Sequence, residues 1–160
     1  MFENEYTMDR KLTTEYVNRQ FGVKAFVIGI SLAIIAFLEA LISESKEGQF
    51  LMMILGAFLL AYPFIVKFIM VRRLEKASEV LHNGKKEKTQ VIFNDENIVL
   101  NEGKVHLEHS YEQMKKVIQS KNFIIIKTKA GGAVLVHKDG FVKGDKEAFL
   151  EFINNKVQKK

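Results

Sequence analysis

Few residues in this chain have the types and spacing that chemistry requires. The 160 residues include four His and no Cys, so disulfides and thiolate sites are excluded. His106 and His109 have a spacing that would suit one face of a helix, but they lie in an alternating segment that predicts a strand. In a strand they point to opposite sides, which makes a poor pair of metal ligands. We therefore expect no metal site.

Catalytic patterns are equally scarce. Gly131-Gly132 is followed by neither a Lys nor a helical pattern, so this pair does not match a phosphate-binding loop. No Ser lies in a nucleophile-elbow pattern. Because no residue can be assigned a catalytic role, we expect a protein that is not an enzyme and that needs no cofactor.

Positive charge is the more informative feature. The formal net charge is +5 at pH 7. Six basic residues follow the second of two apolar runs: Arg72, Arg73, Lys76, Lys85, Lys86 and Lys88. Basic clusters next to a membrane attract anionic lipids, so we predict contact with anionic lipid head groups. The topology rule alone could explain Arg72 and Arg73. Nucleic acid is not expected as a partner, because no aromatic residues are interleaved with this cluster.

The two apolar runs are the elements around which the chain is organised. They cover residues 25–42 and 50–71, and as helices they would be roughly 27 and 33 Å long. The hydrocarbon core of a bilayer is about 30 Å thick. Buried helices of a soluble domain are the alternative, but such helices usually carry a polar face. The runs therefore predict two transmembrane helices.

The flanking charges predict how these helices are oriented. Lys and Arg are frequent before the first run and after the second, whereas the connecting loop, residues 43–49, contains only Lys46. By the positive-inside rule both termini are cytoplasmic and the loop is external. Small residues offer a packing face for the resulting hairpin. They are Gly22, Ala25, Gly29, Ala33, Ala36 and Ala40 in the first run, and Gly56, Ala57 and Ala61 in the second.

Three residues in the runs suggest additional roles. Glu39 and Lys67 each lie one turn from a helix end, where a charged group can reach the interface. We expect interfacial anchoring, with an ion path as the alternative. Pro63 should kink the second helix, and a gating role is the less favoured interpretation.

Residues 1–24 predict a short cytoplasmic strand followed by a helix. Phe2, Tyr6 and Met8 alternate with polar residues, which is typical of a strand, and Thr13 is the expected N-cap of the helix. A strand needs a partner for its backbone. The hairpin returns the chain to the same membrane face, so we predict that this strand pairs with an exposed edge of the C-terminal sheet.

The rest of the chain predicts a second, cytoplasmic domain. After a basic connector at residues 72–88, residues 89–160 contain five or six short alternating segments and the turn sequence Gly131-Gly132. A final amphipathic helix, capped by Asp145, carries Phe149, Phe152 and Ile153 on one face. The expected fold class is therefore an α+β membrane protein, in which a two-helix hairpin joins a small antiparallel pleckstrin-homology-like (PH-like) barrel or half-barrel capped by the C-terminal helix.

Four segments of the C-terminal region resemble the YcxB-like family of bacterial membrane proteins. They are residues 93–98 (FNDENI), 109–117 (HSYEQMKKV), 136–141 (VHKDGF) and 144–149 (GDKEAF). One departure is His137, where the family pattern suggests Pro. The resemblance extends to two upstream spans and an N-terminal strand and helix. It implies a PH-like domain anchored in the bacterial cytoplasmic membrane, and it implies no particular activity.

Together these observations leave two classes of function open. The first is a membrane-anchored cytoplasmic module that binds or scaffolds a protein or peptide partner, in an accessory or self-protection role. The second is a small transport or pore component that acts through the transmembrane hairpin. A homo-oligomer is compatible with either. The two classes differ in whether function depends on the hairpin sequence or only on its presence.

Overall fold

A computed structural model describes residues 1–81, 84 and 87–158. The chain divides into two compact units. The strand unit contains residues 1–12 and 78–160, and the helical unit contains residues 13–77. Together they give an α+β protein in which the described strands form two antiparallel sheets.

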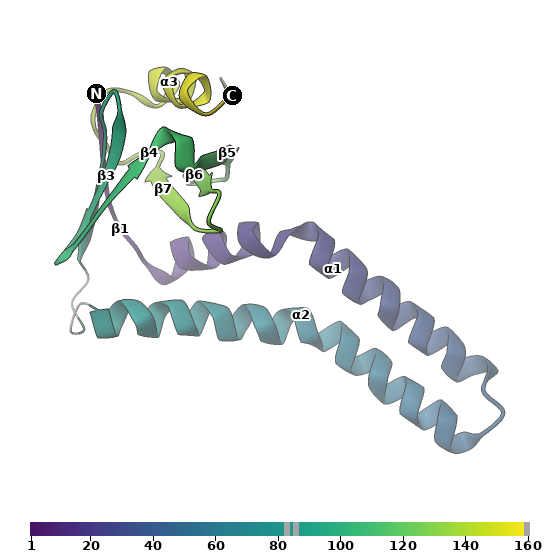
Figure 1. The fold of residues 1–160 in the computed structure, drawn as a ribbon. Coiled ribbons are helices and arrows are strands. Elements are labelled where there is room, and N and C mark those ends of the chain that lie inside the picture. Colours follow the sequence, from purple (N-terminus) through teal and green to yellow (C-terminus); the bar gives the residue numbers. More distant parts are fainter. Residues whose placement is uncertain (82–83, 85–86, 159–160) are drawn as a thin grey trace. The chain divides into compact units, whose positions relative to one another are not determined.

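The strand unit contains both sheets, the short helix η1 and the helix α3 (Figure 1). The first sheet has the order β4-β3-β2-β1-β8 and the second has the order β5-β6-β7. The first sheet consists of β1 (Phe2–Thr7), β2 (Lys88–Phe93), β3 (Asn97–Glu102), β4 (Val105–Ser110) and β8 (Phe141–Lys143). The second consists of β5 (Met114–Gln119), β6 (Phe123–Thr128) and β7 (Ala133–His137), while η1 is Tyr111–Gln113 and α3 is Lys146–Gln158.

The N-terminal strand β1 lies inside the first sheet. It pairs along its whole length with β2, from Phe2 opposite Phe93 to Thr7 opposite Lys88. On its other side it pairs with β8. The prediction that the beginning of the chain joins the C-terminal strands is confirmed. The predicted edge position is wrong, because β8 covers the far side of β1 and turns it into an internal strand.

Asn4 connects β1 to the second sheet. Its side chain is fully buried. The Nδ2 group donates to the carbonyl of His137 at 2.8 Å, and Oδ1 accepts from the backbone N–H of His137 at 2.9 Å. The amide therefore pairs with both backbone groups of His137 at the end of β7, where the carbonyl also accepts from the N–H of Gly140 at 3.1 Å. A buried polar residue in an otherwise apolar strand face is explained by this pairing.

The core of the strand unit lies between the sheets and α3. Asp145 caps α3 as predicted, since its Oδ1 accepts from the N–H of Ala148 at 2.9 Å. The predicted apolar face of α3 contributes the fully buried Phe149 and Ile153, whereas Phe152 is only partly buried. Figure 1 shows α3 lying across one end of the strands.

Two tyrosines of the strand unit have pKa values that burial raises. Burial raises the pKa of Tyr6, with a smaller contribution from Glu102. Burial also raises the pKa of Tyr111, with a smaller contribution from Asp95. The Tyr111 hydroxyl donates to the carbonyl of Asn94 at 2.7 Å, so it is satisfied as a neutral group.

The helical unit consists of most of α1 (Arg10–Ile42) and α2 (Lys46–Leu81). The predicted N-cap Thr13 is wrong, because α1 already begins at Arg10. Asp9 caps it by accepting from the N–H of Leu12 at 2.7 Å. At the other end, Ser45 caps α2 by accepting from the N–H of Gly48 at 2.9 Å. Pro63 lies inside α2, which changes direction partway along its length (Figure 1), in keeping with the expected kink.

The predicted small-residue face of α1 is confirmed where its side chains are described. Ala33, Ala36 and Ala40 are buried and Gly29 is partly buried. The side chains of Gly22 and Ala25 lie outside the described residues. The partner helix approaches this face closely, since a Cβ at Gly29 would already be in van der Waals contact with the Leu59 carbonyl oxygen, at 3.5 Å.

The face of α2 was predicted only in part. Gly56 is buried, and a Cβ there would lie 2.8 Å from the Phe37 ring. Ala57 and Ala61 are exposed, which overturns their assignment to the packing face. Pro63 and Val71 are buried instead. Pro63 lies seven residues after Gly56, and Val71 lies eight residues after Pro63. The three residues therefore lie on one side of the helix.

One described helix is long and apolar enough to cross a membrane, namely α2. The described apolar part of α1, Phe26–Ile42, is shorter. In α2 most large apolar side chains are exposed, among them Phe50, Phe58 and Phe64. A helix of this kind in water would expose a large apolar surface, which is unusual for a monomeric soluble protein.

Candidate functional site

The predicted lipid-contact residues do not form one site in a single unit. Arg72, Arg73 and Lys76 are exposed residues of α2 in the helical unit. The Arg72 guanidinium lies over the Phe68 ring, 4.3 Å from its centroid. Lys88 begins β2 in the strand unit and forms an ion pair with Glu5. Lys85 and Lys86 lie outside the described residues. Lipid contact by these groups stays a prediction.

The two histidines are separated as predicted. Both lie on β4, and strand alternation places His106 on the outer side of the first sheet and His109 on the inner side. In the described part of the chain, no group of three or more His, Cys, Asp or Glu could hold a metal ion.

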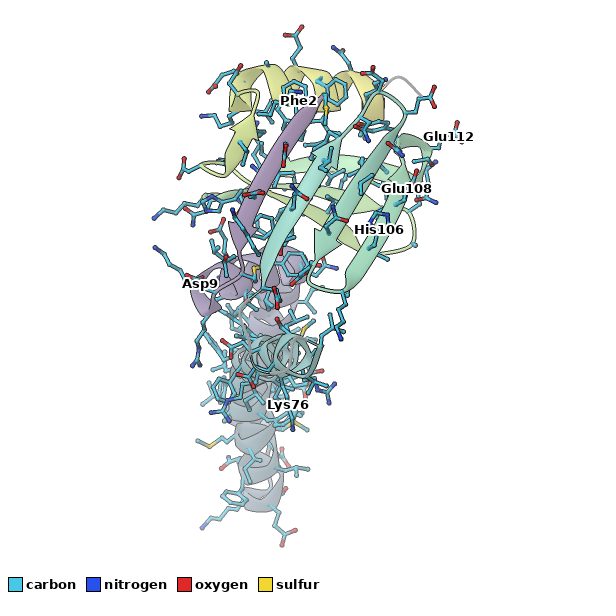
Figure 2. All side chains as sticks on the ribbon, turned by 90° about the vertical axis from the view of Figure 1, so that its left-hand side faces the viewer. Phe2, Asp9, Lys76, His106, Glu108 and Glu112 are labelled. Atoms are coloured by element: carbon cyan, nitrogen blue, oxygen red, sulfur yellow. The ribbon has the colours of Figure 1, made fainter. Side chains whose placement is uncertain are left out.

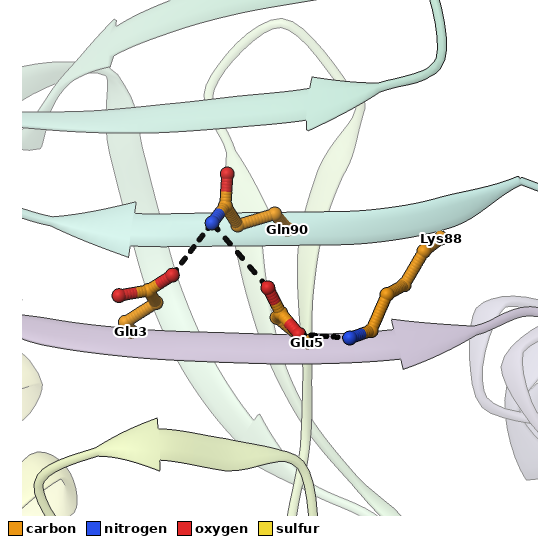
Figure 3. Close-up of polar contacts among 4 residues, drawn as sticks. All are labelled: Glu3, Glu5, Lys88 and Gln90. Atoms are coloured by element: carbon orange, nitrogen blue, oxygen red, sulfur yellow. Dashed lines mark hydrogen bonds and ion pairs between the residues drawn. The ribbon is translucent and has the colours of Figure 1, made fainter.

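A row of polar side chains crosses the outer face of the first sheet. Glu5, Gln90, Asn101 and His106 stand directly opposite one another on β1, β2, β3 and β4. They are joined by hydrogen bonds. The Nδ2 of Asn101 lies 3.1 Å from Gln90 Oε1, and the Oδ1 of Asn101 lies 2.6 Å from His106 Nδ1. Figure 3 shows the other end of the row, where Gln90 lies between Glu3 and Glu5 and Lys88 pairs with Glu5.

The hydrogen bonds of this row run in one direction. The carboxylates of Glu3 and Glu5 can only accept, so Gln90 Nε2 must donate to them, at 2.5 and 3.4 Å. Gln90 Oε1 then accepts from Asn101 Nδ2, and Asn101 Oδ1 accepts from His106 Nδ1–H. The row therefore fixes the proton of His106 on Nδ1 and leaves Nε2 at the outer edge.

Sequence reasoning did not identify this row. Its residues are ordinary polar members of alternating strands, and only the strand register brings them together. The one available signal was the pair Glu3 and Glu5, which places two carboxylates on the same side of the predicted N-terminal strand.

The strand unit carries an open groove of about 590 Å³. It lies where the end of β4 meets η1 and the turn between β6 and β7. Its polar lining includes His109, Ser110, Glu112, Gln113, Thr128 and Lys129. His109 Nδ1–H donates to Gln113 Oε1 at 3.1 Å, which holds the imidazole against one wall. The groove offers both charge signs and hydrogen-bonding groups.

Comparison with known proteins bears on the C-terminal part of the chain. The model of the YcxB-like protein family matches residues 93–153. Neither the curated proteins nor the solved structures contain a match to the chain. The matched segment begins at the end of β2 and ends in α3, so it covers β3 to β8 and η1 but not β1 or the helical unit. The resemblance predicted from the four sequence segments is therefore confirmed over residues 93–153, which match the YcxB-like protein family.

Proposed function

We propose that this protein is a binding or scaffolding module held at the inner face of a bacterial membrane by a two-helix hairpin. One observation supports this proposal above all others. Strands β1 and β2 are neighbours in one sheet, yet the chain between them consists of α1 and α2. The helices therefore occupy the place of a hairpin turn in the strand unit.

This connectivity favours two membrane crossings over one. Both ends of the helical unit lead into the same sheet, and a folded sheet lies on one side of a membrane. If α2 crosses the bilayer, α1 has to cross it in the opposite direction. The small-residue packing between the helices also suits association within a membrane.

The charges at the helix ends favour a cytoplasmic strand unit. Basic residues lie near the start of α1 (Arg10, Lys11 and Arg19) and near the end of α2 (Arg72, Arg73 and Lys76). The opposite end of the hairpin has one basic residue, Lys46, directly after the turn between the helices. The positive-inside rule then places both termini in the cytoplasm. Anionic lipids would stabilise this arrangement by about 1 kcal/mol for each basic residue at the surface.

Thiol labelling in intact cells tests this topology. The natural chain has no Cys, so single substitutions give an unambiguous signal. We expect Ser45→Cys to react with an impermeant reagent in intact cells, and Glu151→Cys, on the exposed side of α3, to react only after permeabilisation. The reverse pattern would contradict a cytoplasmic strand unit, and labelling of both positions in intact cells would contradict two crossings.

The order of elements supports a PH-like assignment for the strand unit. Strands β1 to β4 follow one another across the first sheet, β5 to β7 follow one another across the second, and α3 comes last. Two antiparallel sheets closed at one end by a C-terminal helix are the arrangement that we infer for this domain. The helical hairpin is then an insertion between its first two strands.

We assign partner binding to the groove at the end of β4. A partner segment placed there would meet the imidazole of His109, the ammonium of Lys129 and the carboxylate of Glu112, which all belong to the lining. In contrast, the described contact face between α1 and α2 consists of small and apolar residues, and Glu39 is exposed outside it. This favours an anchoring role for the hairpin over a transport role.

A change of anchor tests the function. Residues 13–77 are replaced by an unrelated membrane hairpin, and a photo-reactive amino acid is placed at position 129 in the native and the exchanged chain. We expect the same cross-linked partner from both chains, because binding depends on the groove. Position 151 on α3 serves as the matched control and should give no such product. Loss of the partner on exchange of the hairpin would contradict the proposal and favour a transport or pore component.

A further inference from the structure

Strand β4 is an edge of the first sheet, with β3 as its neighbour among the described strands. Its outward backbone groups are therefore free to pair with another strand. Leu107 lies in the middle of β4 and is 46% exposed. By contrast, Val91 on β2 and Ile98 on β3, which like Leu107 belong to the inner face, are fully buried. The inner face of the sheet thus remains uncovered at its β4 edge.

We propose that β4 pairs antiparallel with β4 of a second copy of this chain, in a register centred on Leu107. The proposal goes beyond the binding function described above and does not depend on it. Two identical antiparallel strands in one sheet are related by a two-fold axis perpendicular to the sheet. Inner side chains then lie opposite inner ones, and outer opposite outer, only if the axis lies level with a residue and not between two residues. This condition leaves few registers to compare.

The register centred on Leu107 is self-complementary. It places Leu107 opposite Leu107 of the other copy, so each exposed leucine covers the other. On the outer face it places His106 opposite Glu108 twice. Directly opposite residues of unlike charge stabilise antiparallel pairs, and like charges destabilise them. A register centred on Glu108 would oppose two carboxylates, and one centred on His106 would oppose two imidazoles and pair fewer residues of the strand.

The outer groups are available for this contact. His106 uses Nδ1 to donate to Asn101, so Nε2 is the ring nitrogen left for the other copy, and both ring nitrogens of an imidazolium are donors. Glu108 accepts from Asn97 with Oε1 and keeps Oε2. Figure 2 shows His106 and Glu108 side by side on the same face of the sheet. The polar row of one copy would then end on Glu108 of the other.

Disulfide trapping in isolated membranes tests both the contact and its register. In the full-length chain, Leu107→Cys places two thiols on directly opposite residues, whose Cα atoms are about 4.5–5.5 Å apart in an antiparallel pair. A disulfide spans Cα distances of about 4.4–6.8 Å. Val105→Cys and Ser110→Cys are matched controls on the same strand, because the register moves the two Val105 residues about 13 Å apart along the strand. We expect Leu107→Cys to yield about tenfold more covalent dimer than either control.

A charge pair tests the chemistry of the contact in the same background. His106→Glu sets two carboxylates opposite each other twice and should abolish trapping through Leu107→Cys. His106→Lys removes the same imidazole but keeps an opposite charge, so trapping should persist. Native mass of the detergent-solubilised proteins checks that each variant remains folded and shows whether the dimer exists without a disulfide.

Three outcomes would overturn the proposal. Equal trapping at positions 105, 107 and 110 would mean random collision. Absence of trapping at position 107 from a folded protein would mean that the edge stays unpaired. Trapping of Leu107→Cys only to other proteins would mean that a foreign strand, rather than a second copy, occupies this edge.

Discussion

A chain that begins at residue 85 is expected not to form a stable domain, although it contains the whole region that matches the YcxB-like family. The reason is the position of β1 between β2 and β8. Its removal splits the first sheet, exposes the edge of β2 and removes the rings of Phe2 and Tyr6 from the core. It also removes Asn4, which leaves the backbone N–H of His137 without its partner and leaves the carbonyl with the N–H of Gly140 alone.

Restoring β1 without α1 and α2 should restore the fold. Thr7 stands opposite Lys88, so residues 1–7 can be joined to residues 88–160 through an Asn-Gly turn, the sequence preferred in two-residue hairpins. We expect this joined chain to be soluble, to unfold cooperatively in urea and to show slow amide exchange in β6. Folding of both chains alike would contradict an essential role for β1. Failure of the joined chain would mean that the strand unit needs the helices.

Asn4→Asp in the joined chain tests the hydrogen bonds that connect β1 to β7. The carboxylate is nearly isosteric with the amide but cannot donate to the carbonyl of His137. The carbonyl of His137 keeps the N–H of Gly140 as a donor, so the lost hydrogen bond itself costs about 0.5–1.5 kcal/mol, and burial of the carboxylate charge at position 4 adds to this cost. The expected result is a lower urea midpoint with an unchanged slope, which distinguishes a lost contact from a lost strand.

Local features of the fold were well predicted from the sequence, because they depend on neighbouring residues. The alternation in residues 89–137 predicted strands, the Gly131-Gly132 turn joins β6 to β7, and Asp145 caps α3. The N-terminal strand was predicted from the alternation of Phe2 and Tyr6. Each of these patterns acts over a few residues and needs no knowledge of the distant chain.

Features set by distant contacts were missed. Nothing near Phe2–Thr7 tells that β8 will pair with its far side. Gly56, Ala57 and Ala61 are all small, and only the path of α1 decides that Gly56 faces it while the alanines do not. Asp9 and Thr13 are both good N-caps, and the end of the β1 pairing determines which one is used.

The polar row of the first sheet was missed for the same reason. Glu5, Gln90, Asn101 and His106 come from four strands and from positions up to a hundred residues apart. Their alignment follows from register alone, and a shift by one residue in any strand would move its member to the inner face. A sequence pattern of alternating polar residues predicts an outer face but not which of its side chains meet.

Phe149→Ala is expected to destabilise the strand unit most among single truncations in α3, by about 3–5 kcal/mol. Phe149 is fully buried, and its ring centroid lies 4.6 Å from that of Phe93, 5.3 Å from that of Phe141 and 5.5 Å from that of Phe2. These partners come from β1, β2 and β8. Truncation of one ring therefore leaves a cavity at the point where the N-terminal strand meets both of its neighbours.

Phe152→Ala, on the same helix, is the matched comparison. Its ring contacts Phe2 and Tyr111, but it is only partly buried, so less apolar area returns to water on unfolding in the natural protein. We expect a clearly smaller loss than for Phe149→Ala, and a change within about 0.5 kcal/mol for the exposed Glu151→Ala. Urea unfolding of the joined chain measures all three variants. A loss at Phe152 that equals or exceeds the loss at Phe149 would mean that α3 docks through a different face. The number of rings around each position would then no longer determine how much that position contributes to the free energy of unfolding.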